Sequence, residues 1–172
     1  VHRGHRRVIE SADTPGALRG VLTFAQHPLA VLAPQRQPKL ITPVAEQKRA
    51  LLAELGVQVL RNEAAVLERE GQQLYIAGID DPEFFPSQEE FLACLNDLCD
   101  DEGYTLLLSH RPELFADYCD AGVELVFSGH AHGGQFRLPF LGGLYAPHQG
   151  ALPEYDAGLF SQDSTNLIVS RG

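Results

Sequence analysis

No run of about eighteen or more consecutive apolar residues occurs in the 172-residue chain, so the sequence predicts no transmembrane helix. Residues 21–32 are moderately apolar, but a His-Pro pair interrupts them and no signal-peptide cleavage pattern follows. Cysteine is scarce, and Cys94, Cys99 and Cys119 lack zinc-ribbon spacing. Three buried free thiols in a reducing compartment are the better interpretation, which favours a cytoplasmic protein. No internal repeat is present.

Basic residues are outnumbered, 13 against 23 acidic ones, and the net charge of −10 argues against nonspecific binding to nucleic acid. The imbalance is uneven along the chain. Residues 1–40 hold six basic and two acidic side chains, which leaves seven basic and 21 acidic ones for residues 41–172. The basic segment is also rich in Pro and Gln. A nucleic-acid or membrane arm, loose packing on the body of the protein, and a misread coding frame are the alternatives for it.

Histidines follow two short apolar runs, 104–109 and 123–128, each of which is typical of a buried strand. His110 follows the first run, and His130 and His132 follow the second within Gly-His-Ala-His-Gly-Gly. In α/β proteins, residues just beyond the strand ends form ligand sites. Three imidazoles at neighbouring strand ends therefore predict a metal site, although a surface turn with two solvated histidines is the alternative. The flanking glycines are expected to leave room for a substrate.

Strand and helix patterns alternate after residue 40, which predicts an α/β fold. Residues 133–157 are rich in Gly and Pro and are expected to form a long substrate-shaping loop. Helices are predicted over residues 42–55, 87–99 and 112–119. Gly56 would end the first helix, and Ser87 with Glu90 would form a capping box at the start of the second. The predicted strands are 57–60, 64–68, 73–79, 104–109, 123–128 and 166–170.

Several of these segments resemble the C-terminal blocks of calcineurin-like metallophosphoesterases. The likeness rests on residues 108–115, 121–135 and 137–139, and it is closest to the bacterial branch of small phosphodiesterases that includes lipid A precursor pyrophosphatases. It extends to residues 56–63, 77–82, 155–160 and 169–172, and covers roughly residues 46–172.

The resemblance implies a β-sandwich flanked by helices with two divalent metal ions, Mn, Zn, Fe or Ni, at the strand ends. It implies that His110 and His130 ligate one ion and His132 the other. It also implies hydrolysis of a phosphodiester or pyrophosphate by a hydroxide that the two metals activate, on a small-molecule or lipid-linked substrate. No serine or cysteine nucleophile is then needed.

The same family has three N-terminal blocks, Asp-x-His, Gly-Asp and Gly-Asn-His, and none of them occurs in residues 1–50. We therefore expect an atypical basic leader over residues 1–41 and the C-terminal half of the domain over residues 42–172. The N-terminal half of the fold would be missing or replaced. Whether such a chain is an enzyme stays open between three hypotheses: a metal-dependent phosphoesterase, an inert remnant that binds one metal or none, and an interaction module. Half a sandwich would expose edges and apolar faces, which predicts a homo-oligomer or an aggregation-prone product. Peripheral membrane association is a further possibility.

Four other polar residues lie near these motifs and are not expected to bind metal. Asp80 and Asp81 follow a strand and are expected to cap the turn before a proline rather than to bind metal. Arg111 is expected either to contact phosphate or to lie on the surface. His148 is expected to be solvent-exposed.

Overall fold

The computed structural model describes residues 52–54, 56–99, 103–138, 140 and 142–171. By its internal contacts the chain divides into two compact units, residues 1–59 and residues 60–172, and each is described by itself. Residues 1–41, the expected leader, lie outside the described residues, as does most of the helix predicted over residues 42–55.

The described part of the first unit is the end of that helix. Gly56 has a φ of 71°, and the helix ends there with two backbone bonds, Gly56 N–H to Ala53 O and Val57 N–H to Leu52 O, both 2.9 Å long. This pair of bonds closes a helix in the Schellman arrangement, for which glycine is the favoured residue. Leu52 and Val57 are buried together. The predicted closure at Gly56 is confirmed.

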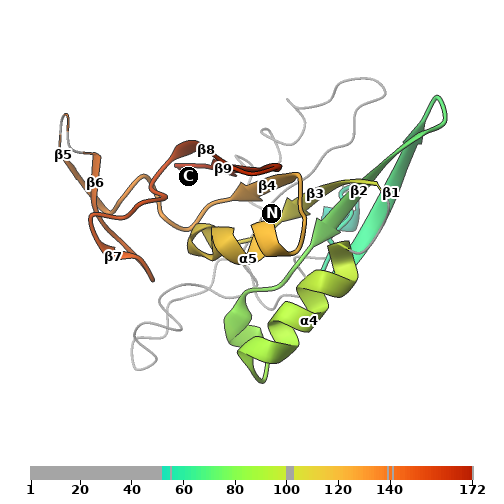
Figure 1. Ribbon diagram of the computed structural model, residues 1–172, viewed down its shortest axis with the longest axis horizontal. Coiled ribbons are helices and arrows are strands. Elements are labelled where there is room, and N and C mark those ends of the chain that lie inside the picture. Colours follow the sequence, from blue (N-terminus) through green and yellow to red (C-terminus); the bar gives the residue numbers. More distant parts are fainter. Residues whose placement is uncertain (1–51, 55, 100–102, 139, 141, 172) are drawn as a thin grey trace. The chain divides into compact units, whose positions relative to one another are not determined.

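The second unit is built on one six-stranded sheet with the order β1-β2-β3-β4-β9-β8 (Figure 1). Neighbours β2, β3, β4 and β9 run parallel, whereas β1 and β8 run antiparallel to their neighbours at the two edges. The strands are β1 (Glu63–Arg69), β2 (Gln72–Gly78), β3 (Tyr104–Leu108), β4 (Leu125–Ser128), β8 (Gly158–Gln162) and β9 (Thr165–Val169). This arrangement confirms the α/β class.

Two predictions about the first strands had different outcomes. The strands predicted over residues 64–68 and 73–79 form as β1 and β2. A tight turn joins them, in which Glu70 and Gly71 take the φ values of 54° and 78° that such a turn between twisted strands requires. The strand predicted over residues 57–60 does not form. The amide of Val57 bonds to the preceding helix instead of to a strand partner.

Helices cover one face of this sheet. α4 (Gln88–Cys99) begins after Ser87, whose hydroxyl accepts a 3.2 Å hydrogen bond from the Glu90 amide, which confirms the predicted capping box. The short helix η2 (Pro112–Leu114) leads directly into α5 (Phe115–Asp120). One apolar core joins both helices to the sheet; its most buried members include Phe91, Leu95, Leu107, Phe115, Tyr118, Val126 and Leu167.

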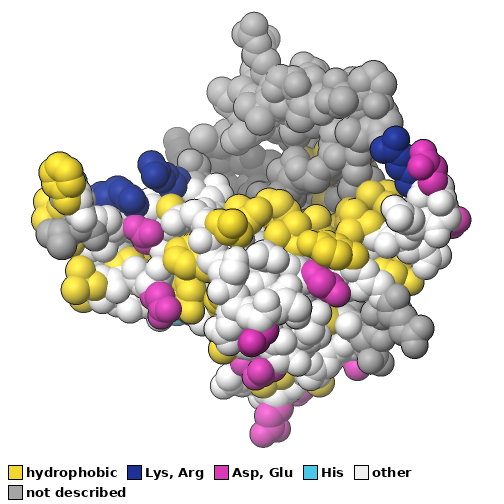
Figure 2. Space-filling view, turned by 45° about the horizontal axis from the view of Figure 1, so that its top comes forward, with side chains coloured by type: hydrophobic (Ala, Val, Ile, Leu, Met, Phe, Trp, Pro, Cys, Tyr) yellow, Lys and Arg dark blue, Asp and Glu magenta, His cyan; other side chains and the backbone are white. Residues whose placement is uncertain are grey.

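The opposite face of the sheet is also apolar. Leu108, Phe127, Ile168 and Leu159 are cross-strand neighbours in register, on the face away from buried Leu107. Phe127 is 37% exposed and Leu159 is 65% exposed. A band of hydrophobic side chains runs across the view in Figure 2. Strands of a parallel sheet that are apolar on both sides are typical of a layer buried on both faces.

A second, three-stranded sheet occupies the region that was expected to be a structureless loop. It consists of β5 (Phe136–Leu138), β6 (Gly142–Ala146) and β7 (Gly150–Ala151), at the left of Figure 1. The prediction of a loop over residues 133–157 is thus wrong. These strands are two to five residues long, too short to give a periodic signal.

No helix in the described part of the chain is long and apolar enough to cross a membrane.

Candidate metal centre

Three adjacent parallel strands deliver polar side chains to the same edge of the sheet. Asp81 follows β2, His110 follows β3 and His130 follows β4. Because the carboxyl ends of parallel neighbours lie side by side, these residues meet, and the ring centroids of His110 and His130 are 4.2 Å apart. The proximity expected from the strand ends is present for these two histidines.

A carboxylate orients His110. The Oδ2 atom of Asp81 lies 2.7 Å from Nδ1 of His110, and the same side chain caps the helix η1 (Pro82–Phe84) by accepting from the Glu83 amide at 3.0 Å. Burial acts to raise the pKa of the Asp81 carboxyl, but hydrogen bonds from His110 and Arg111 outweigh it and hold that pKa well below its usual range. The ionised carboxylate can only accept, so Nδ1 of His110 donates. In the neutral ring the lone pair is then on Nε2, as in the carboxylate–histidine–metal arrangement.

Arg111 organises the acidic residues around the site. Its guanidinium bonds to both oxygens of Asp81, Nε to Oδ2 at 2.7 Å and Nη2 to Oδ1 at 2.9 Å. It also donates to Glu83 at 3.0 Å and to Glu113 at 3.2 Å. The side chain is only 8% exposed. The predicted surface position is therefore wrong, because three carboxylates engage the guanidinium inside the protein, and the phosphate contact stays a prediction. The expected capping role of Asp81 is confirmed, and the bond to His110 is an addition to it.

A buried tyrosine fixes the backbone on either side of His110. The Tyr118 hydroxyl donates to the carbonyl oxygen of Arg111 at 2.6 Å and pairs with the Ser109 hydroxyl at 2.7 Å. Because one proton of Tyr118 is used on the carbonyl, Ser109 is the donor in the second bond. Tyr118 is fully buried in the core, so α5 positions the segment that carries His110.

His130 is bonded to a histidine that the sequence did not single out as functional. Its Nε2 atom lies 2.8 Å from Nδ1 of His148, which is in the turn between β6 and β7, and the two rings stack with centroids 5.0 Å apart. Burial, together with electrostatic interactions with His110 and Arg111, lowers the pKa of His130 to about 3. The His130 ring is therefore neutral at physiological pH, which is the form that binds metal.

His132 does not share the contacts that join His110, His130 and His148. It is exposed, and no hydrogen bond or ring contact with another described residue involves it. Its φ is 51°, and those of His130 and His148 are 65° and 61°. A left-handed backbone at a non-glycine residue is costly, by about 1–3 kcal/mol, and such residues gather at functional sites. Buried Ala131 anchors the loop between the two histidines.

The neighbouring glycines have a packing role as well as the expected one of leaving space. A side chain at Gly134 would place its Cβ 2.4 Å from the Cα of Gly143, so Gly134 permits the close approach of the β6 backbone. Its φ of 81° independently favours glycine. At Gly129 a Cβ would meet nothing within 4 Å among the described residues, so open space is present there.

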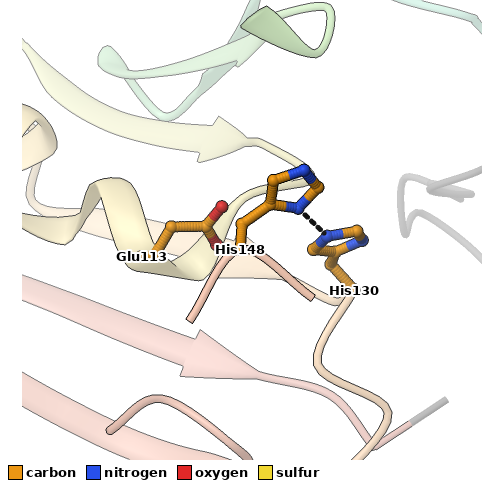
Figure 3. Close-up of side chains that lie close together, drawn as sticks. All are labelled: Glu113, His130 and His148. Carbon is orange, nitrogen blue, oxygen red and sulfur yellow. Dashed lines mark hydrogen bonds between the residues drawn. The ribbon is translucent and has the colours of Figure 1, made fainter. Parts of the chain in front are cut away.

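Glu113, His130 and His148 offer donor atoms that all lie within 4.8 Å of one another (Figure 3). Oε1 of Glu113 accepts from Arg111, whereas Oε2 is buried with no hydrogen-bond partner among the described residues. In Figure 3 the Glu113 carboxylate extends toward His148. Two imidazoles and an unsatisfied carboxylate oxygen are suitable ligands for a divalent transition metal, so the residues present fit such an ion.

Sequence reasoning missed His148 and Glu113. His148 follows β6 in a segment with little periodicity, and its side chain is 42% exposed, which matches the expectation of solvent exposure but not of a passive role. Glu113 stands three residues after His110 and directly after the proline that begins η2, and this spacing is the signal that was available for it.

Histidines and carboxylates thus gather at the ends of the parallel strands of an α/β sheet, an arrangement that could hold a divalent metal ion. The C-terminal region of this chain belongs to the calcineurin-like metallophosphoesterase family. The chain is 34% identical over 126 residues to "Uncharacterized metallophosphoesterase YkuE" of Bacillus subtilis (strain 168), covering 72% of this chain and 42% of that protein.

Two further relatives agree. "Phosphodiesterase YaeI" of Escherichia coli (strain K12) is 29% identical over 141 residues, 76% of this chain and 47% of the relative. "UDP-2,3-diacylglucosamine pyrophosphatase LpxG" of Chlamydia trachomatis serovar D is 31% identical over 135 residues, 72% of this chain and 37% of the relative. The chain thus spans less than half the length of these three relatives. No solved structure gives a significant match.

The N-terminal region is similar to a different family. A family model described as FAD synthetase matches residues 1–63. This region carries none of the histidines at the metal centre. It extends beyond residue 41, where composition placed the boundary, and ends close to residue 59, where the first compact unit ends.

Proposed function

We propose that this chain supplies the histidine side of a metal-dependent phosphoesterase centre that hydrolyses phosphodiesters or pyrophosphates. The observation that carries the proposal is the meeting of His110 and His130 at the ends of β3 and β4, with Asp81 orienting the first. The relatives' names, phosphodiesterase and pyrophosphatase, support the reaction class.

In this proposal His110 and His130 hold one divalent ion and His132 the other. Two such ions, when bound, polarise the phosphoryl group and supply a hydroxide nucleophile from water. The residues of this chain contribute orientation. Asp81 fixes the plane and tautomer of His110, and Arg111 fixes Asp81. The low pKa of His130 keeps its lone pair available.

The partial β-sandwich also stays a proposal, supported by the apolar sheet face that bears Phe127 and Leu159. The family resemblance places a second layer on this face, and an exposed apolar face of this size favours self-association as well. Phe136 on β5 and Leu152, directly after β7, are each 68% exposed, and the turn between β6 and β7 carries His148. An apolar surface beside the site fits a substrate with a lipid part, or contact with a membrane surface.

The enzyme hypothesis is tested by metal content together with hydrolysis of bis-p-nitrophenyl phosphate by the purified chain. Two Mn or Zn ions per chain and turnover that is abolished by His110→Ala and His130→Ala support it. One weakly held ion without turnover supports the inert remnant instead. Partner binding that survives the His110, His130 and His132 triple alanine variant supports the interaction module.

The position of the boundary between the two parts of the chain is tested separately. Limited proteolysis with mass spectrometry of the fragments would locate it. First cuts near residue 41 support the boundary predicted from composition, whereas first cuts near residues 59–63 support the extent of the FAD synthetase match.

A further inference from the structure

We propose that Glu113, His130 and His148 together hold one divalent transition-metal ion. The ligand atoms would be Oε2 of Glu113, Nε2 of His130 and Nδ1 of His148. The inference rests on the proposed function only in treating His130 as a metal ligand. It adds two ligands that lie in none of the histidine motifs of the sequence, and one of them comes from the smaller sheet.

Glu113 carries a donor atom that lacks a partner among the described residues. Its Oε1 accepts from Arg111 at 3.2 Å, while its Oε2 is buried without a hydrogen bond. A buried carboxylate oxygen left unsatisfied is unfavourable, and a cation within reach removes that cost. Arg111 thus holds the Glu113 carboxylate by one oxygen and leaves the other directed to the histidines.

His148 is arranged as metal-bound histidines usually are. Its Nε2 atom lies 3.4 Å from Oε1 of Glu83, and its Nδ1 atom faces Nε2 of His130 at 2.8 Å. Ligating histidines usually donate their other ring nitrogen to a carboxylate. Glu83 is therefore a positioning residue for His148, just as Asp81 is for His110, and Arg111 bonds to both carboxylates.

The distance between the two histidine donors is close to the distance that one bound ion requires. Two nitrogens bound to zinc at about 2.0–2.1 Å in tetrahedral geometry lie roughly 3.3 Å apart. The observed 2.8 Å between His130 and His148 is the length of a hydrogen bond, so the rings separate by about half an ångström to admit the ion. Both residues have left-handed φ values, 65° and 61°, which local contacts alone do not favour.

The donor set also determines which metals bind. Two imidazoles and one carboxylate suit zinc, cobalt or iron, whereas magnesium and calcium prefer oxygen ligands. The three ligands leave coordination positions for water or a phosphate oxygen.

The test is isothermal titration of the full chain, stripped with EDTA, with Zn²⁺ and in parallel with Mg²⁺. We expect Zn²⁺ to bind far more tightly than Mg²⁺, and Glu113→Gln and His148→Asn each to weaken the first Zn²⁺ site by at least about tenfold. Glu68→Gln, an exposed acid on β1, is the matched control for Glu113, and His132→Asn tests the alternative ligand set. The Glu68→Gln control is expected to change the affinity less than about twofold, well below the change for a ligand or its support.

Unchanged Zn²⁺ affinity in Glu113→Gln and His148→Asn, with a loss in His132→Asn, overturns the inference and leaves the proposed function standing. Tight binding that needs Glu113 and His148, without hydrolysis of a phosphodiester, supports the inference and counts against the proposed function. Should either variant misfold, nitrogen-15 spectra of the unaltered chain decide. Zn²⁺ must shift Nδ1 of His148 and Nε2 of His130, and an unshifted His148 Nδ1 overturns the proposal.

Discussion

Replacing Arg111 by lysine should destabilise the protein much more than the same change at Arg61. Both guanidiniums bind an aspartate with two nitrogens, Arg111 to Asp81 and Arg61 to Asp80. The difference is burial. The side chains of the Arg111–Asp81 pair are 8% and 11% exposed, and those of the Arg61–Asp80 pair are 39% and 16% exposed.

The magnitude follows from what lysine cannot reproduce. Arg111 makes four side-chain hydrogen bonds to three carboxylates, and a single ammonium group cannot reach all of them from one position. Charge-assisted bonds contribute about 1.5–3 kcal/mol each, and breaking a buried pair costs roughly 3–5 kcal/mol. Because lysine keeps the charge, we expect a loss of about 2–4 kcal/mol for Arg111→Lys. At Arg61, which is much more exposed, the expected loss is about 1 kcal/mol or less.

Thermal unfolding followed by circular dichroism measures both variants. A loss of about 3 kcal/mol corresponds to a Tm lower by roughly 6–12 °C in a chain of this size. Arg111→Lys should also weaken Zn²⁺ binding by about 10–100-fold, because the carboxylates that orient His110 and His148 lose their common anchor. Equal losses of Tm in the two variants would refute the argument from burial, and unchanged metal affinity would refute the anchoring role.

Three other predictions concern protonation, reactivity and association. In metal-free protein, NMR should show His130 titrating near pH 3, and titration near 6.5 would contradict the burial of this ring. Because this pKa lies below that of an unfolded histidine, the stability of the native state should fall as pH decreases from about 6.5 through 3. Burial, with the nearby charge of Glu124, raises the pKa of the Cys99 thiol to about 11. Iodoacetamide at pH 8 should therefore modify Cys99 about a hundredfold more slowly than a free thiol, and equal rates would show that the thiol is exposed. Because Phe127 and Leu159 leave an apolar sheet face exposed, sedimentation at micromolar concentration should show oligomers, and a single monomer boundary would be evidence against self-association.

The part of the site that the sequence could predict consists of residues placed directly after predicted parallel strands. His110 and His130 follow apolar runs that form adjacent parallel strands, so their proximity follows from the direction and order of β3 and β4. The helix start at Ser87 and the helix end at Gly56 could also be predicted from the sequence, because both residues form their hydrogen bonds within a few residues of their own position. The conclusions that held depend on local chemistry or on strand order alone.

The rest of the site depends on contacts between distant segments. His148 reaches His130 only because the smaller sheet folds next to the strand ends, and its strands are too short to be recognised by periodicity. Arg111 was placed on the surface or on a phosphate because its three acidic partners come from two separate short helices. Neither a charge pattern nor a motif in one segment reports such a pairing.

The charges around Arg111 give a physical reason for a cation at this edge of the sheet. Asp81, Glu83 and Glu113 bring three negative charges against the single positive charge of Arg111, and His130 stays neutral at physiological pH. These three carboxylates and Arg111 alone therefore sum to a net charge of −2, which the charge of one divalent ion would balance. Because these groups lie partly out of water, their attraction for a cation is stronger than that of the same charges on a solvated surface. Arg111 helps to keep Asp81 ionised and holds all three carboxylates in place. Its single positive charge is too small to balance theirs, so the electrostatic attraction for a metal ion comes from the same contacts that fold the site.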